Sequence, residues 1–418
     1  TLLAPAQFGR NIGGQVNAVS KSGGSETHGT VYGTFNSSQL NARNFFDTTF
    51  GTATTTVRAN NQNVLVQTRN AAGTVLSQQP LTVRNESGGE DSFTFWRAGF
   101  VIGGPVKKEK AFYFASFESS ATNATEEHSF AVPTIEQRGA FGTGTTGMFQ
   151  NPFTGQPTAT IPGTRTGSAI FSLYPFPNNS NGVYGANTVT QVLPASGRGV
   201  VLSGKLDDNF KIKSREQSVT GRYNFTNDWR EIPTTGDAIS SALKPRIRTH
   251  NLSFFLNSKL SGPNSAKGMF NQVRLSYGRT HLRFDEVRDP RTLLPSNSFP
   301  GIPFLLNAPD LLNITAPPAA GVPNTAQVIY VRQSITTEQD LGPLGQVVIA
   351  GFSPVGVDVY NFPQQRVNNT YQIADNLTLR VRDHSYTFGV DIRRSELNRN
   401  LPRNARPLAT FNGAPRLV

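Results

Sequence analysis

The sequence predicts an all-β protein, and three observations lead to this fold class. The chain has 418 residues and is rich in turn and aromatic residues, with 39 Gly, 27 Pro and 29 Phe, whereas strong helix formers are sparse. Only 36% of its residues are hydrophobic, which is low for a packed core of this size but ordinary where each strand has one apolar face. Segments that alternate between apolar and polar residues recur along the whole length.

About nine segments have the period-two alternation of a β-strand. In the segment 93–103, for example, Trp96, Phe100 and Ile102 share one face and Arg97 lies on the other. The expected strands cover residues 29–35, 93–103, 111–118, 200–210, 218–225, 250–258, 272–280, 370–381 and 385–393.

The connections between these strands alternate between short and long. Short polar turns are expected near 106–110, 211–216, 261–267 and 382–384. Long links are expected near 36–92, 119–198 and 285–365. Links of this length are uncommon in compact domains, but outer-membrane barrels combine tight periplasmic turns with long outer loops.

We therefore expect a partial antiparallel transmembrane β-barrel, with about nine strands of a larger barrel, long extracellular loops and short periplasmic turns. Its apolar face would meet lipid and its polar face an aqueous lumen. Aromatic residues near the strand ends would form interfacial girdles. These are Tyr113, Phe117, Tyr223, Phe225 and Tyr277.

Composition excludes several kinds of protein. Cysteine does not occur, so disulfide frameworks and thiolate chemistry are excluded. The net charge is +12, but the basic residues are scattered, so we expect no nucleic-acid partner. No apolar run approaches the roughly 20 residues of a membrane-spanning helix. The chain begins at Thr1 without a leader, and we expect a fragment or a processed product.

The sequence offers no catalytic constellation, so we expect no enzyme activity, cofactor or metal. GVVLSGKL at 199–206 resembles a phosphate-binding loop, but Leu206 stands where a hydroxyl is needed, and a barrel strand is the better interpretation. The neighbouring carboxylates Asp207 and Asp208, like Asp285 and Glu286, would point to opposite faces of a strand. The five histidines lack a metal-binding spacing; they are His28, His128, His250, His281 and His384.

The stretch IGGQVNAVSKSGGSETHGTVYGTF, residues 12–35, resembles the junction in TonB-dependent outer-membrane receptors of the Oar-like family where the last plug strand ends and the first barrel strand begins. SQLNARNFFD at 38–47 is similar to the segment after that strand, and FWRAGFVIGGPVKKEKAFYFASFE at 95–118 is similar to an early hairpin. GKLDDNFKIKSREQSVTGRYNF and NNTYQIADNLTLRVRDHSYTFGVDIRR are similar to later hairpins.

The resemblance implies that residues 1–28 are the C-terminal end of a plug domain with its hinge, and 29–418 the N-terminal portion of the barrel. It implies gated uptake of an unidentified small ligand across the bacterial outer membrane, driven by a TonB-type energy-coupling protein whose recognition box is not in this chain. Candidate ligand contacts would lie in the long loops and on the lumen-facing Arg97, Arg222 and Arg274, but the sequence commits to no ligand-binding residue.

About nine strands cannot close a barrel of the roughly 22 strands used by that family, so the remainder of the protein would have to supply the other strands, because lipid does not tolerate unpaired strand edges. The alternative is a secreted or surface adhesin with a soluble β-sandwich or solenoid that binds carbohydrate or matrix. The barrel and the adhesin hypotheses differ in one observable property: a sandwich would bury Leu252, Phe254 and Phe388 between two sheets.

Overall fold

The computed structural model describes residues 19–42, 91–134, 173–262, 267–287, 345–403 and 406–411, together with short strands between 54 and 84, between 146 and 162 and between 293 and 343, and residues 137 and 170. Within these residues no helix is long and apolar enough to cross a membrane.

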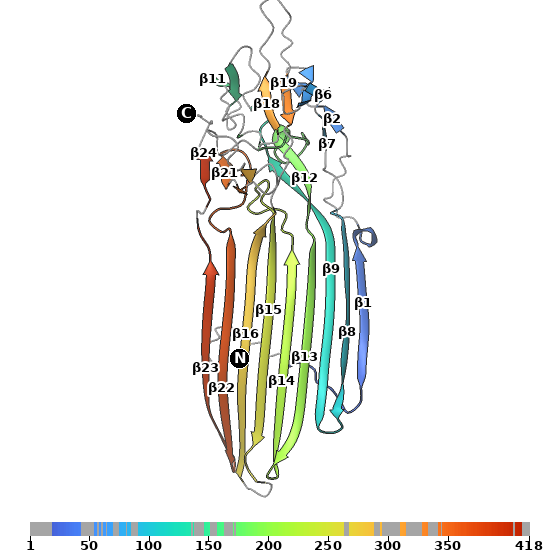
Figure 1. Ribbon diagram of the computed structural model, residues 1–418, viewed down its shortest axis with the longest axis vertical. Coiled ribbons are helices and arrows are strands. Elements are labelled where there is room, and N and C mark those ends of the chain that lie inside the picture. Colours follow the sequence, from blue (N-terminus) through green and yellow to red (C-terminus); the bar gives the residue numbers. More distant parts are fainter. Residues whose placement is uncertain are drawn as a thin grey trace, which may run out of the picture.

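A ten-stranded antiparallel sheet dominates the structure, and its long strands stand side by side (Figure 1). Nine strands follow the order β1-β8-β9-β13-β14-β15-β16-β22-β23, and β12 pairs with the far end of β9. Their bounds are β1 His28–Ser37, β8 Phe93–Lys107, β9 Ala111–Ala131, β12 Thr188–Pro194, β13 Gly197–Ile212, β14 Arg215–Arg230, β15 Leu243–Lys259, β16 Lys267–Glu286, β22 Gln364–Val381 and β23 His384–Asn400.

All nine expected strands are confirmed, and each is longer than the alternation indicates. The clearest difference is in β9: residues 119–131, expected as the start of a long link, continue the strand. This part, SSATNATEEHSFA, has no apolar face for the alternation to reveal. Hydrogen bonds to β8 and β12 hold it in the sheet instead.

The short turns lie at one end of the sheet and the long links at the other (Figure 1). Two residues, Lys213 and Ser214, join β13 to β14 with φ of 48° and 62°, the conformation that two-residue hairpins favour. Arg382, with φ 52°, turns β22 into β23. These turns are tighter than the expected spans because hydrogen bonding continues to the last residue of each strand.

The long links carry small sheets of their own. The largest has four strands in the order β18-β19-β5-β6. The remaining elements are η2 Ser38–Leu40, β2 Thr54–Thr56, β3 Arg58–Ala59, β4 Gln62–Asn63, β5 Leu65–Arg69, β6 Val75–Pro80, β7 Thr82–Arg84, β10 Thr146–Gln150, β11 Pro157–Pro162, η4 Gly185–Asn187, β17 Leu293–Leu294, β18 Asp310–Ile314, β19 Val328–Arg332, β20 Gly342–Pro343, β21 Gln346–Ile349 and β24 Leu408–Phe411.

The links also build a compact core at their end of the sheet, which we call the loop cap. Its buried side chains come from the ends of β9 and β12 and from residues 173–174, 239 and 347–355. Backbone hydrogen bonds connect these segments: Ile239 donates to Pro354 over 2.7 Å and Gly356 donates to Ile239 over 2.8 Å. The main buried core of the described chain therefore lies in the loops and not between two sheets.

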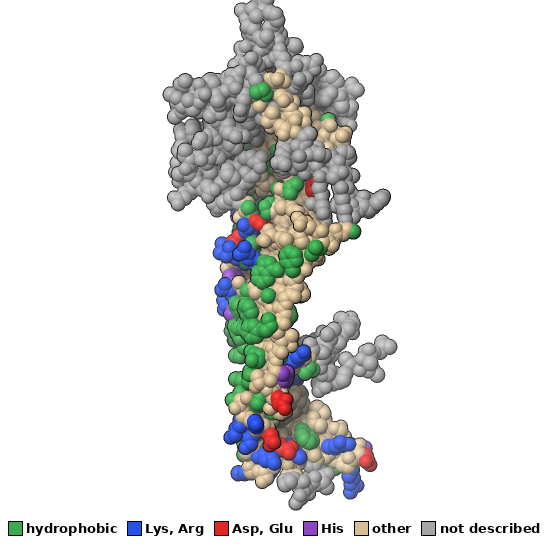
Figure 2. Space-filling view, turned by 90° about the vertical axis from the view of Figure 1, so that its right-hand side faces the viewer, with side chains coloured by type: hydrophobic (Ala, Val, Ile, Leu, Met, Phe, Trp, Pro, Cys, Tyr) green, Lys and Arg blue, Asp and Glu red, His purple; other side chains and the backbone are tan. Residues whose placement is uncertain are grey.

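The register of the sheet gives it one apolar and one polar face. Cross-strand partners share a face, so the partners Phe100 and Phe117, then Leu202 and Phe225, lie on the apolar face. Side chains on this face remain exposed, with Leu252 at 52% and Phe388 at 61%. They do not converge into a dry interior, as a sandwich would require. Figure 2 shows hydrophobic side chains gathered in a band along the strands, with Lys and Arg at the turn end.

Candidate functional site on the polar wall

The opposite face, which we call the polar wall, is lined by hydrogen-bonding side chains from all nine long strands. Ser203 Oγ donates to Asn224 Oδ1 over 2.6 Å, and Gln272 Nε2 donates to Asn257 Oδ1 over 2.7 Å. Further along the sheet, Gln372 Nε2 donates to both carboxylate oxygens of Asp391. Each pair joins neighbouring strands, so the wall is held by a ladder of polar contacts.

The three arginines named from the sequence all lie on this wall, but they do not form one cluster. Arg97 on β8 is paired with Glu118 over 3.4 Å, and Glu118 also accepts a hydrogen bond from Tyr32 Oη over 2.7 Å. Arg222 lies on β14 and Arg274 on β16. The strands β9 and β13 separate Arg97 from Arg222, and β15 separates Arg222 from Arg274.

Arg222 and Arg274 differ from Arg97 in having no carboxylate partner among the described residues. The Nε atoms of both are buried without a hydrogen-bond partner there. Asn376, with its amide oriented to accept, receives a hydrogen bond of 3.0 Å from Nη2 of Arg274. Neither guanidinium group is therefore neutralised by a carboxylate of the described residues.

Lys205 on β13 is a cation of the wall with two polar partners. Its Nζ lies 3.5 Å from Asp207 Oδ2, and Thr220 Oγ1 donates to Asp207 Oδ1 over 2.6 Å. Lys205 Nζ also donates to Ser22 Oγ over 2.6 Å. The contact joins residues 183 positions apart, and the sequence gives no signal for it.

The segment before β1 packs closely on the wall at the β8–β9 hairpin. A Cβ on Gly23 would lie 2.3 Å from the carbonyl oxygen of Tyr113 and 2.6 Å from that of Gly104. A Cβ on Gly104 would lie 2.5 Å from Thr27 Oγ1. Gly23 must be glycine because backbone lies directly against backbone there, and at Gly104 an added Cβ would meet Thr27. The expected hinge, 22–28, is therefore seated against the sheet, whereas residues 1–18 of the expected plug end lie outside the described residues.

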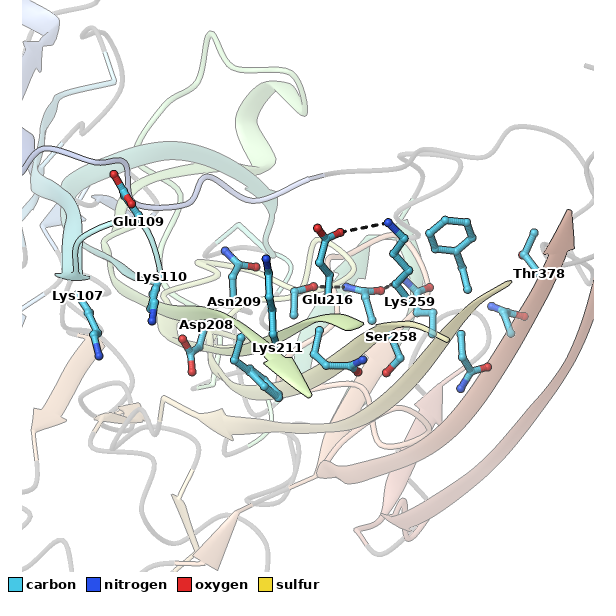
Figure 3. Close-up of a pocket in the computed structure, with 18 of the residues that line it drawn as sticks. Lys107, Glu109, Lys110, Asp208, Asn209, Lys211, Glu216, Ser258, Lys259 and Thr378 are labelled. Carbon is cyan, nitrogen blue, oxygen red and sulfur yellow. Dashed lines mark hydrogen bonds and ion pairs between the residues drawn. The ribbon is translucent and has the colours of Figure 1, made fainter. Parts of the chain in front are cut away.

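A polar hollow of about 1560 Å³ opens on the wall near the short turns (Figure 3). Lysines and carboxylates from three hairpins line it, and Lys259 is paired with Glu216 over 3.7 Å. Lys107, Lys110 and Lys211 also border the hollow and form no ion pair with another described residue. Four lysines and three carboxylates line the hollow, so it carries one net positive charge at the turn end of the wall.

The remaining candidate carboxylates lie on both faces of the sheet. Asp207 lies on the wall beside Lys205, whereas Asp208 pairs across the strands with Val219 on the apolar face. Glu286 binds Arg406, and its neighbour Asp285 binds Arg283 over 2.5 Å. In the part of the chain that the structure describes, no three His, Cys, Asp or Glu residues are grouped as metal ligands would be.

Comparison with known proteins identifies the architecture. A family model described as an outer membrane beta barrel domain matches residues 77–416, which is most of the chain. A search of curated proteins finds no match. The matched range includes all the long strands except β1.

Proposed function

The chain belongs to the outer membrane β-barrel domain family, and from this membership we propose that it forms part of a TonB-dependent receptor for gated uptake of a small ligand. The family places the chain in the bacterial outer membrane, with lipid against its apolar face. The polar wall then faces the lumen, the short turns face the periplasm and the loop cap lies outside.

One observation is the main support for the proposal: the chain that leads into β1 runs along the polar wall. Ser22 is hydrogen bonded to Lys205 over 2.6 Å, and Gly23 lies against Gly104. A receptor whose plug precedes its barrel needs this path, because the plug must be led into the lumen and not away from it. The resemblance of 12–35 to a plug–barrel junction supports the same assignment.

The barrel would be completed by further strands of the same protein. β1 and β23 are the two edges of the sheet, and each would expose a row of unpaired backbone groups to hydrocarbon. Each unpaired backbone group costs several kcal/mol in lipid. A few such groups together would cost about as much free energy as the whole stability of a folded domain. The pairing of additional strands with both edges removes this cost.

Ligand capture is assigned to the loop cap and the unpaired wall arginines. The cap is packed on its own core, so its outer surface can present a fixed shape to a ligand. Arg222 and Arg274 would then receive anionic groups of the ligand or of the plug. No enzymatic step is part of this proposal.

Single-channel recording in planar bilayers tests whether a plug closes the barrel. The recording uses the full-length protein that contains this chain. We expect little conductance from the intact protein and a large, stable pore from a variant that lacks everything before His28. Gel migration with and without heating would establish that both barrels are folded. An intact protein that conducts as freely as the truncated one would refute the plugged-receptor proposal and favour adhesion.

Energy coupling needs a separate measurement. The purified periplasmic domain of a TonB-type protein should co-purify with the full-length receptor and not with the variant truncated before His28. Equal recovery with both would show that the interaction does not involve the segment before the barrel.

A further inference from the structure

Four arginines form a collar on the apolar face, directly beyond the hydrophobic band on the side of the loop cap. Arg246 and Arg248 belong to β15, and Arg279 and Arg283 belong to β16. The register pairs Arg246 with Arg283, and Arg248 with His281, so the four side chains occupy one patch. We call this patch the arginine collar.

The order of residues along the strands fixes the level of the collar relative to the bilayer. On β15, the band residues Phe254 and Leu252 are followed by His250 and then by Arg248. On β16, Leu275 is followed by Tyr277 and then by Arg279. Tyr277 packs on Tyr371 with ring centroids 5.1 Å apart. Aromatic residues mark the membrane–water interface, so the collar lies at the head-group level of the outer leaflet.

The arginines of the collar outnumber the carboxylates that neutralise them among the described residues. Asp285 serves both Arg283, over 2.5 Å, and Arg246, over 3.8 Å. Among the described residues, Arg248 donates only to the neutral Asn227, over 3.3 Å, and Arg279 has no ion pair. All four arginines are exposed. Figure 2 shows Lys, Arg and His side chains gathered above the hydrophobic band.

We propose that the arginine collar binds the phosphate groups of a phosphorylated glycolipid in the outer leaflet. Guanidinium groups match phosphate oxygens with paired hydrogen bonds, and the acyl chains of the same molecule would lie on Leu252, Phe254 and Leu275. Neither soluble phosphate nor a protein partner explains why the cations stop where the hydrocarbon band begins. This inference depends on the outer-membrane location and not on the transport proposal.

The test is a binding titration of the full-length protein in detergent, with a bisphosphorylated glycolipid of the lipid A type as the probe. Arg248→Gln combined with Arg279→Gln should weaken binding by about tenfold or more, because each change removes charge-assisted hydrogen bonds. Arg380→Gln combined with Arg382→Gln alters the net charge equally at the turn end and should leave the affinity unchanged.

The lipid itself supplies a second comparison that needs no variant. The dephosphorylated glycolipid should bind the unmodified protein at least about tenfold more weakly than the phosphorylated one. Equal binding of the two lipids, equal binding of phosphatidylglycerol, displacement by inorganic phosphate at similar concentration, or equal losses in both double variants would each overturn the proposal.

Discussion

At the residue scale, most strand residues fit the division into an apolar face and a polar wall. The exceptions show where other constraints act on the chain. Gly23 and Gly104 are small because the hinge backbone lies directly on the β8–β9 hairpin. Asp375 is an exception of another kind: it lies on the apolar face, with Val273 and Val390 as its cross-strand partners. Its Oδ1 has no hydrogen-bond partner among the described residues.

Replacing Gly23 by alanine should lift the hinge from the wall, because the added Cβ would lie 2.3 Å from the Tyr113 carbonyl oxygen. Hydrogen–deuterium exchange of the full-length protein should then show faster exchange of the amides in 20–27. Gly204→Ala is the matched control, since nothing lies within 4 Å of a Cβ at that position. Unchanged exchange in Gly23→Ala would mean that the hinge does not rest on the wall.

Replacing Asp375 by valine should stabilise the barrel by about 1–2 kcal/mol, because a carboxylate facing hydrocarbon is unfavourable. Guanidinium unfolding of the full-length protein in detergent micelles measures the difference. The comparison is Asp391→Asn on the polar wall, which weakens two hydrogen bonds from Gln372 and should be destabilising. A loss of stability in Asp375→Val would indicate that a polar partner contacts this carboxylate.

At the element scale, the long strands form the polar wall and segments of the long links form the loop cap. β21 pairs in parallel with β24, which brings the chain after β23 back to the cap. Arg406 binds Glu286 at the end of β16, and the two side chains are only 17% and 12% exposed. Burial lowers the pKa of the Arg406 guanidinium, so its pairing with Glu286 must offset the lost hydration.

Replacing Arg406 by alanine should therefore loosen the cap, because Glu286 would be left as a buried charge without its partner. Removing one member of a buried pair costs about 3–5 kcal/mol. Protease cleavage within 406–411 should become faster in the full-length protein. Arg403→Ala, at an exposed position, should have no such effect, and equal cleavage in both variants would show that the pair does not fasten the cap.

At the scale of the whole molecule, the sheet is incomplete. Its edges β1 and β23 are not paired with each other in the described sheet. Eight of the nine long strands carry exposed hydrophobic side chains, and those of β9 are half-buried or buried. A protein with this surface needs lipid or detergent, and a sheet with these edges needs further strands.

Expressed on their own, residues 1–418 should aggregate in buffer or require detergent to stay dispersed. Light scattering and analytical ultracentrifugation, with and without detergent, measure this. The full-length protein in the same detergent is the reference for a closed barrel. A monodisperse and folded monomer in plain buffer would argue strongly against the membrane assignment.

The sequence by itself determined the strands, the two faces and the alternation of short turns and long links. These are local properties: a period of two residues, or a cluster of turn residues, is readable wherever lipid or water selects side chains on one face. The prediction stopped short on β9, where residues 119–131 leave the membrane and selection for an apolar face ends.

Only the tertiary structure decided how distant segments meet. The contact between Ser22 and Lys205, the pair of Arg406 with Glu286 and the core of the loop cap join positions tens to hundreds of residues apart. The arginine collar likewise depends on the register between β15 and β16. The alternation of apolar and polar residues assigns each arginine to a face, but which arginine of β15 lies opposite which residue of β16 is decided by how the two strands pair.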